Sequence, residues 1–267
     1  MSTTTALPAS TTPWKPDLKI ATLLGAASAL AVAMLMPYLM QLMPQKFAVL
    51  PVPMWVLVVA QSMQALVVVG LMSLAGLRMG HRVGLGAPLL QHWFAKRPLA
   101  SPLKPVQAIL LGVAAALLIV ALSAVIDPFL PTPVNPPATA GAGQSALNGL
   151  LASFYGGIAE ELQLRLFLMT LLVWTVAMLK KAKPAPRVYW IALVIAAVLF
   201  GIGHLPTANH VWGLDAIVVS RTVLLNAIAG MVCGWLYWKR GLEMAIVAHF
   251  SADIVLHVLL PLLGKSL

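Results

Sequence analysis

Charged residues are scarce in this sequence. It holds 17 Lys and Arg and only 7 Asp and Glu among 267 residues, so 9% of the chain is charged, whereas about 25% is usual for soluble domains. Hydrophobic residues make up 61% of the chain, which leaves too little polar surface to cover a water-soluble globule of this size. The composition therefore excludes a soluble globular protein and predicts one that crosses a membrane several times.

Cysteine is almost absent as well. The only cysteine, Cys233, lies within an apolar stretch. A disulfide framework and a metal cluster built from cysteines are therefore excluded as sources of stability or chemistry.

Long apolar runs are the dominant feature of the sequence. Runs of about 18 or more residues with few charges are typical of membrane-spanning helices. Seven are present, at residues 20–43, 51–77, 106–126, 147–179, 188–204, 214–238 and 242–263. We therefore expect an all-α, polytopic transmembrane bundle of seven or eight membrane helices. It would comprise a polar N-terminal tail at residues 1–19, a single transmembrane domain at 20–267 and a loosely ordered loop rich in Pro, Ala and Gly at 128–143.

The cations alternate between the two sides of the predicted spans. Thirteen lie in the N-terminal tail and in every second loop: Lys15, Lys19, Arg78, Arg82, Lys96, Arg97, Lys104, Lys180, Lys181, Lys183, Arg187, Lys239 and Arg240. The other loops hold only Lys46 and Lys265. The positive-inside rule then predicts a cytoplasmic N-terminus. The net charge of +10 is explained by topology, so we expect the lipid bilayer as a partner and no nucleic acid. Because the chain is short and shows no eukaryotic targeting features, we expect it to reside in a bacterial inner membrane.

Ionisable side chains inside the predicted spans are few. Each is costly in the bilayer interior unless it is paired or faces a wet cavity, so a group of them indicates a functional site. The group consists of Glu160, Glu161, Arg165, His204, Arg221, His249, Asp253 and His257.

The fourth span carries two adjacent glutamates with different helical neighbours. Residues four apart share a helix face, so Glu161 is expected to pair with Arg165. Glu160 is turned about 100° away and is free to act as a general base beside a histidine. The alternative is that all three residues form a buried ion network that only holds helices together.

Two later spans carry histidines: one ends in a histidine and the other contains two. His204 closes the fifth span, where it can reach a cavity or serve as a polar cap. His249 and Asp253 are four residues apart and adjacent on one helix face, as a functional pair or as a structural hydrogen bond. We expect His257 to be structural. Arg221 and Asn226 are expected to line the cavity or to pair with Asp215, without a catalytic role.

Together these residues resemble the CPBP family of intramembrane proteases, which includes the type II CAAX prenyl endopeptidases and bacterial immunity-type proteins. Its EExxxR motif is matched by Glu160, Glu161 and Arg165. Its FxxxH motif is matched by Phe200 and His204, and its third motif, a His followed four residues later by Asn or a similar polar residue, by His249 and Asp253. The resemblance covers about residues 145–260, the expected protease-like core, and implies a helical bundle with the site between helices.

The resemblance also implies a mechanism, that of a glutamic-type intramembrane endopeptidase acting on a peptide or membrane-protein substrate without a cofactor. Glu160 would be the general base, assisted by His204. His249 and Asp253 would face the tetrahedral intermediate, and Glu161 with Arg165 would support the first of these helices. Asp253 departs from the pattern, because an ionised carboxylate cannot donate a hydrogen bond to an oxyanion as an amide can.

Three other interpretations use the same residues. Glu160, His204 and His249 are possible ligands of a catalytic zinc, although no HExxH pair is present on one helix. A proton-coupled transporter would also bury Glu, His and Arg, although the chain shows no internal repeat of the kind found in many transporters. An inert interaction protein would retain the motifs only to hold its helices together.

Overall fold

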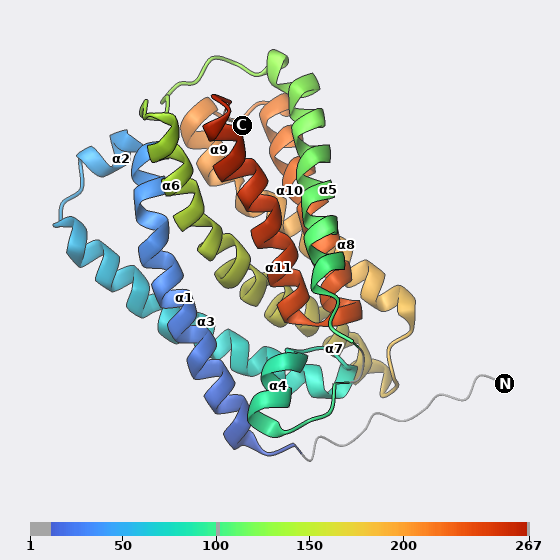
Figure 1. Cartoon of the computed structure of the whole chain (residues 1–267). Helices are drawn as coiled ribbons and strands as arrows, with labels where there is room; N and C mark the ends of the chain where they lie inside the picture. Colours follow the sequence, from blue (N-terminus) through green and yellow to red (C-terminus); the bar gives the residue numbers. More distant parts are fainter. Residues whose placement is uncertain (1–11, 100–101, 266–267) are drawn as a thin grey trace.

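The computed structural model describes residues 12–99 and 102–265, and every regular element in these ranges is a helix (Figure 1). Within them, seven helical stretches are long and apolar enough to cross a membrane, which confirms the predicted spans. They are Trp14–Leu42 (α1), Met54–Val83 (α3), Pro105–Phe129 (α5 and η1), Ala142–Lys180 (α6, η2, η3 and α7), Pro186–Trp212 (α8 and α9), Ala216–Arg240 (α10) and Leu242–Leu262 (α11, η4 and α12). Two short helices, α2 (Pro44–Ala48) and α4 (Pro88–Ala95), lie in the connections.

The N-terminal tail is shorter than predicted. Residues 1–11 lie outside the described ranges, but α1 already begins at Trp14 and not at residue 20. Asp17 is buried at this end of α1, with its carboxylate 2.9 Å from Arg78 Nη1 and 2.8 Å from His81 Nε2 of α3. These contacts join the first two membrane helices. Residues 14–19, which were predicted to belong to the tail, are therefore part of α1.

The fourth membrane stretch is a composite helix. It consists of α6 (Ala142–Phe154), the π-helical segments η2 (Tyr155–Glu160) and η3 (Leu162–Met169), and α7 (Thr170–Lys180). Its 39 residues exceed the roughly 20 that span a bilayer at right angles, and it runs obliquely through the bundle (Figure 1). Around Glu160 its turns are wider than those of a regular α-helix. Such turns occur frequently at functional sites.

Tight packing between helices surrounds the site. A Cβ atom on Gly230 of α10 would lie 2.9 Å from Ala197 of α8, and one on Gly234 would lie 2.8 Å from the Leu193 side chain. The two glycines, four residues apart, therefore let α10 and α8 (Pro186–Gly203) approach closely.

The loop after α5 is more ordered than predicted. The amides of Val134 and Asn135 donate to the Val211 carbonyl of α9 (Leu205–Trp212) at 2.7 and 3.1 Å. The amide of Ala138 donates to the Gln41 carbonyl of α1 at 2.8 Å. The loop is therefore attached to the ends of two membrane helices.

Candidate active site

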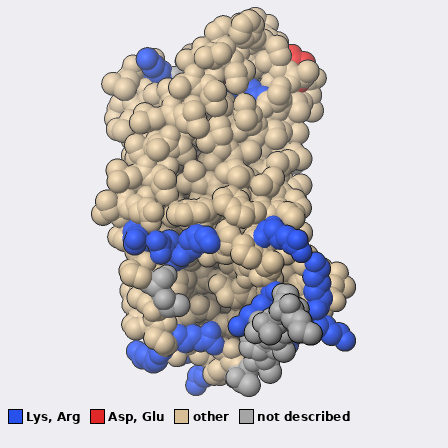
Figure 2. Space-filling model, turned by 90° about the vertical axis from the view of Figure 1, so that its right-hand side faces the viewer, with Lys and Arg blue, Asp and Glu red and all other residues tan. Residues whose placement is uncertain are grey.

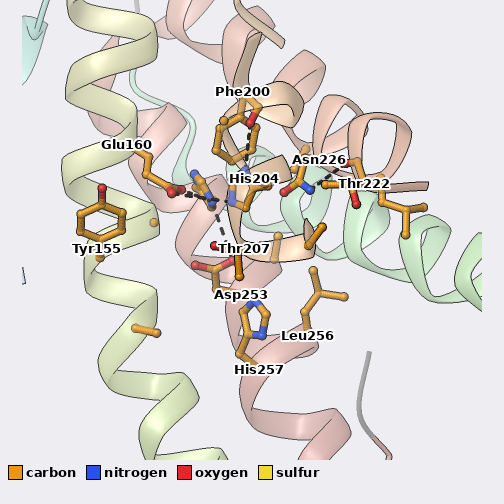
Figure 3. A pocket seen from close by; sticks show the side chains of 18 of the residues that line it. Tyr155, Glu160, Phe200, His204, Thr207, Thr222, Asn226, Asp253, Leu256 and His257 are labelled. Carbon is orange, nitrogen blue, oxygen red and sulfur yellow. Dashed lines mark hydrogen bonds and ion pairs between the residues drawn. The ribbon is translucent and has the colours of Figure 1, made fainter. Parts of the chain in front are cut away.

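Side chains from three separate membrane stretches meet around one cavity of about 560 Å³. Glu160 ends η2, His204 lies between α8 and α9, and Asp253 ends α11 (Leu242–Asp253). Figure 3 shows Glu160 and His204 directed toward one another across this space. The three motifs, which are far apart in the sequence, therefore contribute to one site.

Glu160 lies between two imidazoles. Its Oε1 atom is 3.8 Å from His204 Nε2, and its Oε2 atom is 3.8 Å from His249 Nε2. Both separations are longer than a direct hydrogen bond. The carboxylate side chain is 17% exposed and lines the cavity, and no residue of the described ranges forms a direct hydrogen bond with it.

The orientation of His204 is fixed by its own helix. Its Nδ1 atom lies 2.9 Å from the Phe200 carbonyl. Because a carbonyl only accepts, Nδ1 carries the hydrogen, and the neutral ring presents Nε2 as an acceptor toward Glu160. The Phe200 ring packs edge-on against His204, with ring centroids 4.8 Å apart. The four-residue spacing of the motif thus sets both the position and the tautomer of the imidazole.

His249 is bound more closely by Glu161 than by Asp253. Its Nδ1 atom lies 2.7 Å from Glu161 Oε1, whereas its Nε2 atom is 3.8 Å from Asp253 Oδ1. Of the two alternatives for this pair, a direct structural hydrogen bond between His249 and Asp253 is therefore not formed. His249 instead bonds to Glu161, which joins α11 to the helix that carries the EExxxR motif.

Arg165 completes a buried network below His249. Its Nη1 atom lies 3.1 Å from Glu161 Oε1, as the spacing predicted, and its Nη2 atom donates to the Gly230 carbonyl at 3.1 Å. Glu161 and Arg165 are 0% and 1% exposed. The ion-network interpretation therefore describes Glu161 and Arg165, whereas Glu160 stands outside that network.

Gly156 makes room for the polar groups of α11. A Cβ atom at this position would lie 2.5 Å from Asp253 Oδ2 and 3.1 Å from His249 Nε2. Only a glycine lets the η2 backbone approach both side chains in this arrangement. Gly156 was not among the residues predicted to form the site, although it lies four residues before Glu160 in the sequence.

Arg221 lines the cavity but does not pair with Asp215. Its guanidinium contacts Asp127 at the end of α5, at 2.6 and 3.1 Å. The Asp215 carboxylate instead accepts from the Val218 amide at the start of α10. Asp215 is thus a helix N-cap, the usual role of Asp immediately before a first turn.

Four further residues that could interact with a ligand line the cavity. Asn226 was predicted to do so. Tyr38 and Tyr155 were not predicted from the sequence, and His257 was expected to be structural.

The ligand atoms that lie closest together are not those of the predicted zinc set. In the described ranges, the group with all its ligand atoms within 4.8 Å of one another is Glu161, Cys233 and His249. Glu161 Oε1 already contacts His249 Nδ1 and the Arg165 guanidinium. A dication there would have to displace these contacts beside a buried cation, so the donor set fits a metal poorly.

Comparison with known proteins agrees with the motifs. Residues 142–255 match the family model described as Type II CAAX prenyl endopeptidase Rce1-like. No curated protein and no solved structure matches the chain. The matched segment begins with α6 and ends just after Asp253, so it contains every residue of the three motifs. This segment of the chain is therefore similar to the type II CAAX prenyl endopeptidases, which are membrane proteases.

Proposed function

We propose that this protein is an intramembrane endopeptidase that hydrolyses a peptide bond with a water molecule activated by Glu160 and His204. The observation that carries the proposal is the 3.8 Å separation between Glu160 Oε1 and His204 Nε2. Both atoms are acceptors, and a water donates at about 2.8 Å to each partner, so one water bridges them through its two hydrogens. A water held in this way is oriented for deprotonation.

The chemical steps follow from these positions. Glu160 takes a proton from the water as the water oxygen bonds to the carbonyl carbon of the substrate. The resulting oxyanion accepts a hydrogen bond in the tetrahedral intermediate. When the carbon–nitrogen bond breaks, Glu160 returns the proton to the leaving amine. The products are a new carboxyl terminus and a new amino terminus.

His249 is the proposed oxyanion donor. The Glu161 carboxylate, 2.7 Å from Nδ1, stabilises a protonated imidazole, whose Nε2–H then points to the same side of the site as Glu160. Asp253 lies beside this atom at 3.8 Å. Because Glu161 already orients the ring, Asp253 forms part of the cavity wall and is not needed to position His249.

Cleavage of a peptide panel tests the proposal. Internally quenched peptides, some of them prenylated, are incubated with detergent-solubilised wild type and with Glu160→Ala, with and without a strong chelator. We expect cleavage by the wild type that is lost in Glu160→Ala and unaffected by the chelator. Cleavage abolished by the chelator would favour the zinc mechanism, and equal behaviour of both proteins on every peptide would reject Glu160 as the base.

A further inference from the structure

The cavity extends from the candidate site toward one end of the bundle. Its lining includes Leu35, Leu39 and Leu42 in the last turns of α1, Thr207 and Trp212 in α9 and Arg221 in the first half of α10. All of these segments lie near the end at which α2, α9 and the C-terminal helix are found (Figure 1). The loops at the opposite end, after α3, α7 and α10, contribute no residue to this lining.

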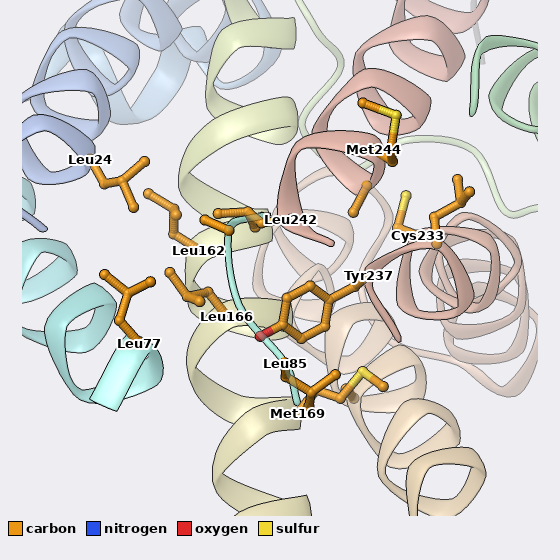
Figure 4. Packing of buried hydrophobic residues seen from close by; sticks show 14 of the residues in the cluster. Leu24, Leu77, Leu85, Leu162, Leu166, Met169, Cys233, Tyr237, Leu242 and Met244 are labelled. Carbon is orange, nitrogen blue, oxygen red and sulfur yellow. The ribbon is translucent and has the colours of Figure 1, made fainter. Parts of the chain in front are cut away.

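A tightly packed layer of buried side chains closes the cavity toward the opposite end of the bundle. Leu162 and Leu166 follow Glu161 along the composite helix, and both are 0% exposed. Leu236 and Leu242 come from α10 and α11 and are also 0% exposed, and Tyr237 is 1% exposed. Figure 4 shows Leu162, Leu166, Tyr237 and Leu242 gathered between these helices. This layer separates the glutamates from the end of the bundle that carries the loops after α7 and α10.

The closed end is also the cationic end. Lys180 and Arg187 flank the α7–α8 connection, and Lys239 and Arg240 end α10. Figure 2 shows Lys and Arg gathered toward one end of the molecule, and few at the other. By the positive-inside rule, Lys and Arg are concentrated in cytoplasmic loops. These cations lie at the end of the bundle opposite to the one toward which the cavity extends.

We propose that the active site opens to the extracytoplasmic side of the membrane and takes a peptide segment exposed on that side, with the N-terminus of the enzyme in the cytoplasm. This inference rests on the proposed function. The cavity suits such a segment because its lining combines apolar side chains of α1, such as Leu35 and Leu39, with the polar groups of Thr222 and Asn226 in α10. Substrates confined to the cytosol are excluded by this orientation.

Cysteine labelling in cells tests the direction of the opening. Cys233, the only native cysteine, is buried, and Cys233→Ala provides the background. Thr207→Cys and Gly203→Cys place a thiol in the cavity, and an added Cβ at Gly203 meets no atom within 4 Å. Val49→Cys, 78% exposed after α2, reports the open end. Ala185→Cys, exposed between α7 and α8, reports the cationic end.

The expected pattern is specific. In intact spheroplasts, a membrane-impermeant maleimide should modify Val49→Cys and both cavity cysteines, and should modify Ala185→Cys only after permeabilisation. Labelling of Ala185→Cys but not Val49→Cys in intact spheroplasts would overturn the orientation. Labelling of the cavity cysteines only after permeabilisation would overturn the direction of the opening. Failure of both cavity cysteines to react even in detergent would contradict an open cavity.

Cleavage in oriented vesicles separates this proposal from the proposed function. A membrane-impermeant quenched peptide is added to proteoliposomes whose orientation is known from the Val49→Cys and Ala185→Cys labelling. We expect cleavage where the Val49 end faces outward and little cleavage in the opposite orientation. Cleavage in detergent together with the reverse preference in vesicles would overturn the sidedness alone. Absence of cleavage in detergent would reject the proposed function, and the labelling would still decide which way the cavity faces.

Discussion

The Nδ1 atom of His249 lies 2.7 Å from Oε1 of Glu161. This contact gives the two adjacent glutamates of the EExxxR motif separate tasks. Glu161 holds the imidazole from below, while Glu160 approaches the other side of the same ring, with its Oε2 atom 3.8 Å from Nε2. The second glutamate therefore links the ion pair with Arg165 to the oxyanion donor that we propose.

Replacing Glu161 by Gln should lower both stability and activity. The substitution leaves Arg165 charged and 1% exposed without an anionic partner, and breaking a buried pair in this way costs about 3–5 kcal/mol. Thermal unfolding in detergent measures the loss, and Glu160→Gln is the matched control, expected to unfold like the wild type. The double variant Glu161→Gln/Arg165→Met should recover stability but not cleavage. A double variant no more stable than Glu161→Gln would contradict this account.

Replacing Gly156 by Ala should impair cleavage without unfolding the protein. The new methyl group must displace Asp253 and His249, to which it would lie 2.5 and 3.1 Å away. Alanine has a more favourable helix propensity than glycine by about 1 kcal/mol. We therefore expect the activity to fall much more than the free energy of unfolding. Gly143→Ala in α6 meets no atom within 4 Å and should keep wild-type activity. Full activity in Gly156→Ala would show that the close approach of η2 is unimportant.

The Arg221 and Asp127 pair should be energetically coupled. It joins α10 to the end of α5, with side chains 12% and 32% exposed. Asp127→Asn, Arg221→Gln and the double variant form a cycle in which we expect a coupling of about 1 kcal/mol. Unfolding temperatures in detergent provide the measurement, and strictly additive effects would mean that the pair contributes nothing.

Cleavage should not depend on Cys233. The thiol belongs to the group of closest possible metal ligands, with Glu161 and His249, but the proposed reaction assigns it no part. We expect Cys233→Ala to cleave at the wild-type rate and to be insensitive to a chelator. Two results together would instead identify a metal site: loss of activity in Cys233→Ala, and recovery of activity when zinc is added to chelator-treated wild type.

The arrangement of spans was predictable because membrane insertion depends on local sequence. Apolar runs mark the helices and loop cations mark their ends, so all seven stretches were found. Three bounds differ by six or more residues: the first stretch begins at Trp14, and the second and fifth end at Val83 and Trp212. The start of α1 was missed because Lys15, Asp17 and Lys19 look like a polar tail. Asp17 is buried only through partners 61 and 64 residues away, Arg78 and His81.

The ionisable members of the candidate site were predictable from the sequence, but Gly156, Tyr38, Tyr155 and several of the contacts were not. The spacing of Glu161 and Arg165 predicted their ion pair, since residues four apart meet on one helix. The bond from His249 to Glu161 joins residues 88 apart, and the pair of Arg221 with Asp127 joins residues 94 apart. Such contacts depend on how the helices pack, which no local spacing encodes. The wider turns around Glu160 also had no sequence signal that we could interpret.

The most direct test of the central claim is the rate of peptide cleavage by Glu160→Gln. The amide preserves the size of the side chain but cannot accept a proton from water. Among residues 12–99 and 102–265, the ion-pair partners of Glu160 lie at 3.8 Å, so the substitution breaks no direct hydrogen bond that stabilises the fold. The account predicts a fall in kcat of roughly 10²–10⁴-fold with an unchanged unfolding temperature. A variant that folds normally and cleaves at the wild-type rate would contradict the assignment of Glu160 as the base.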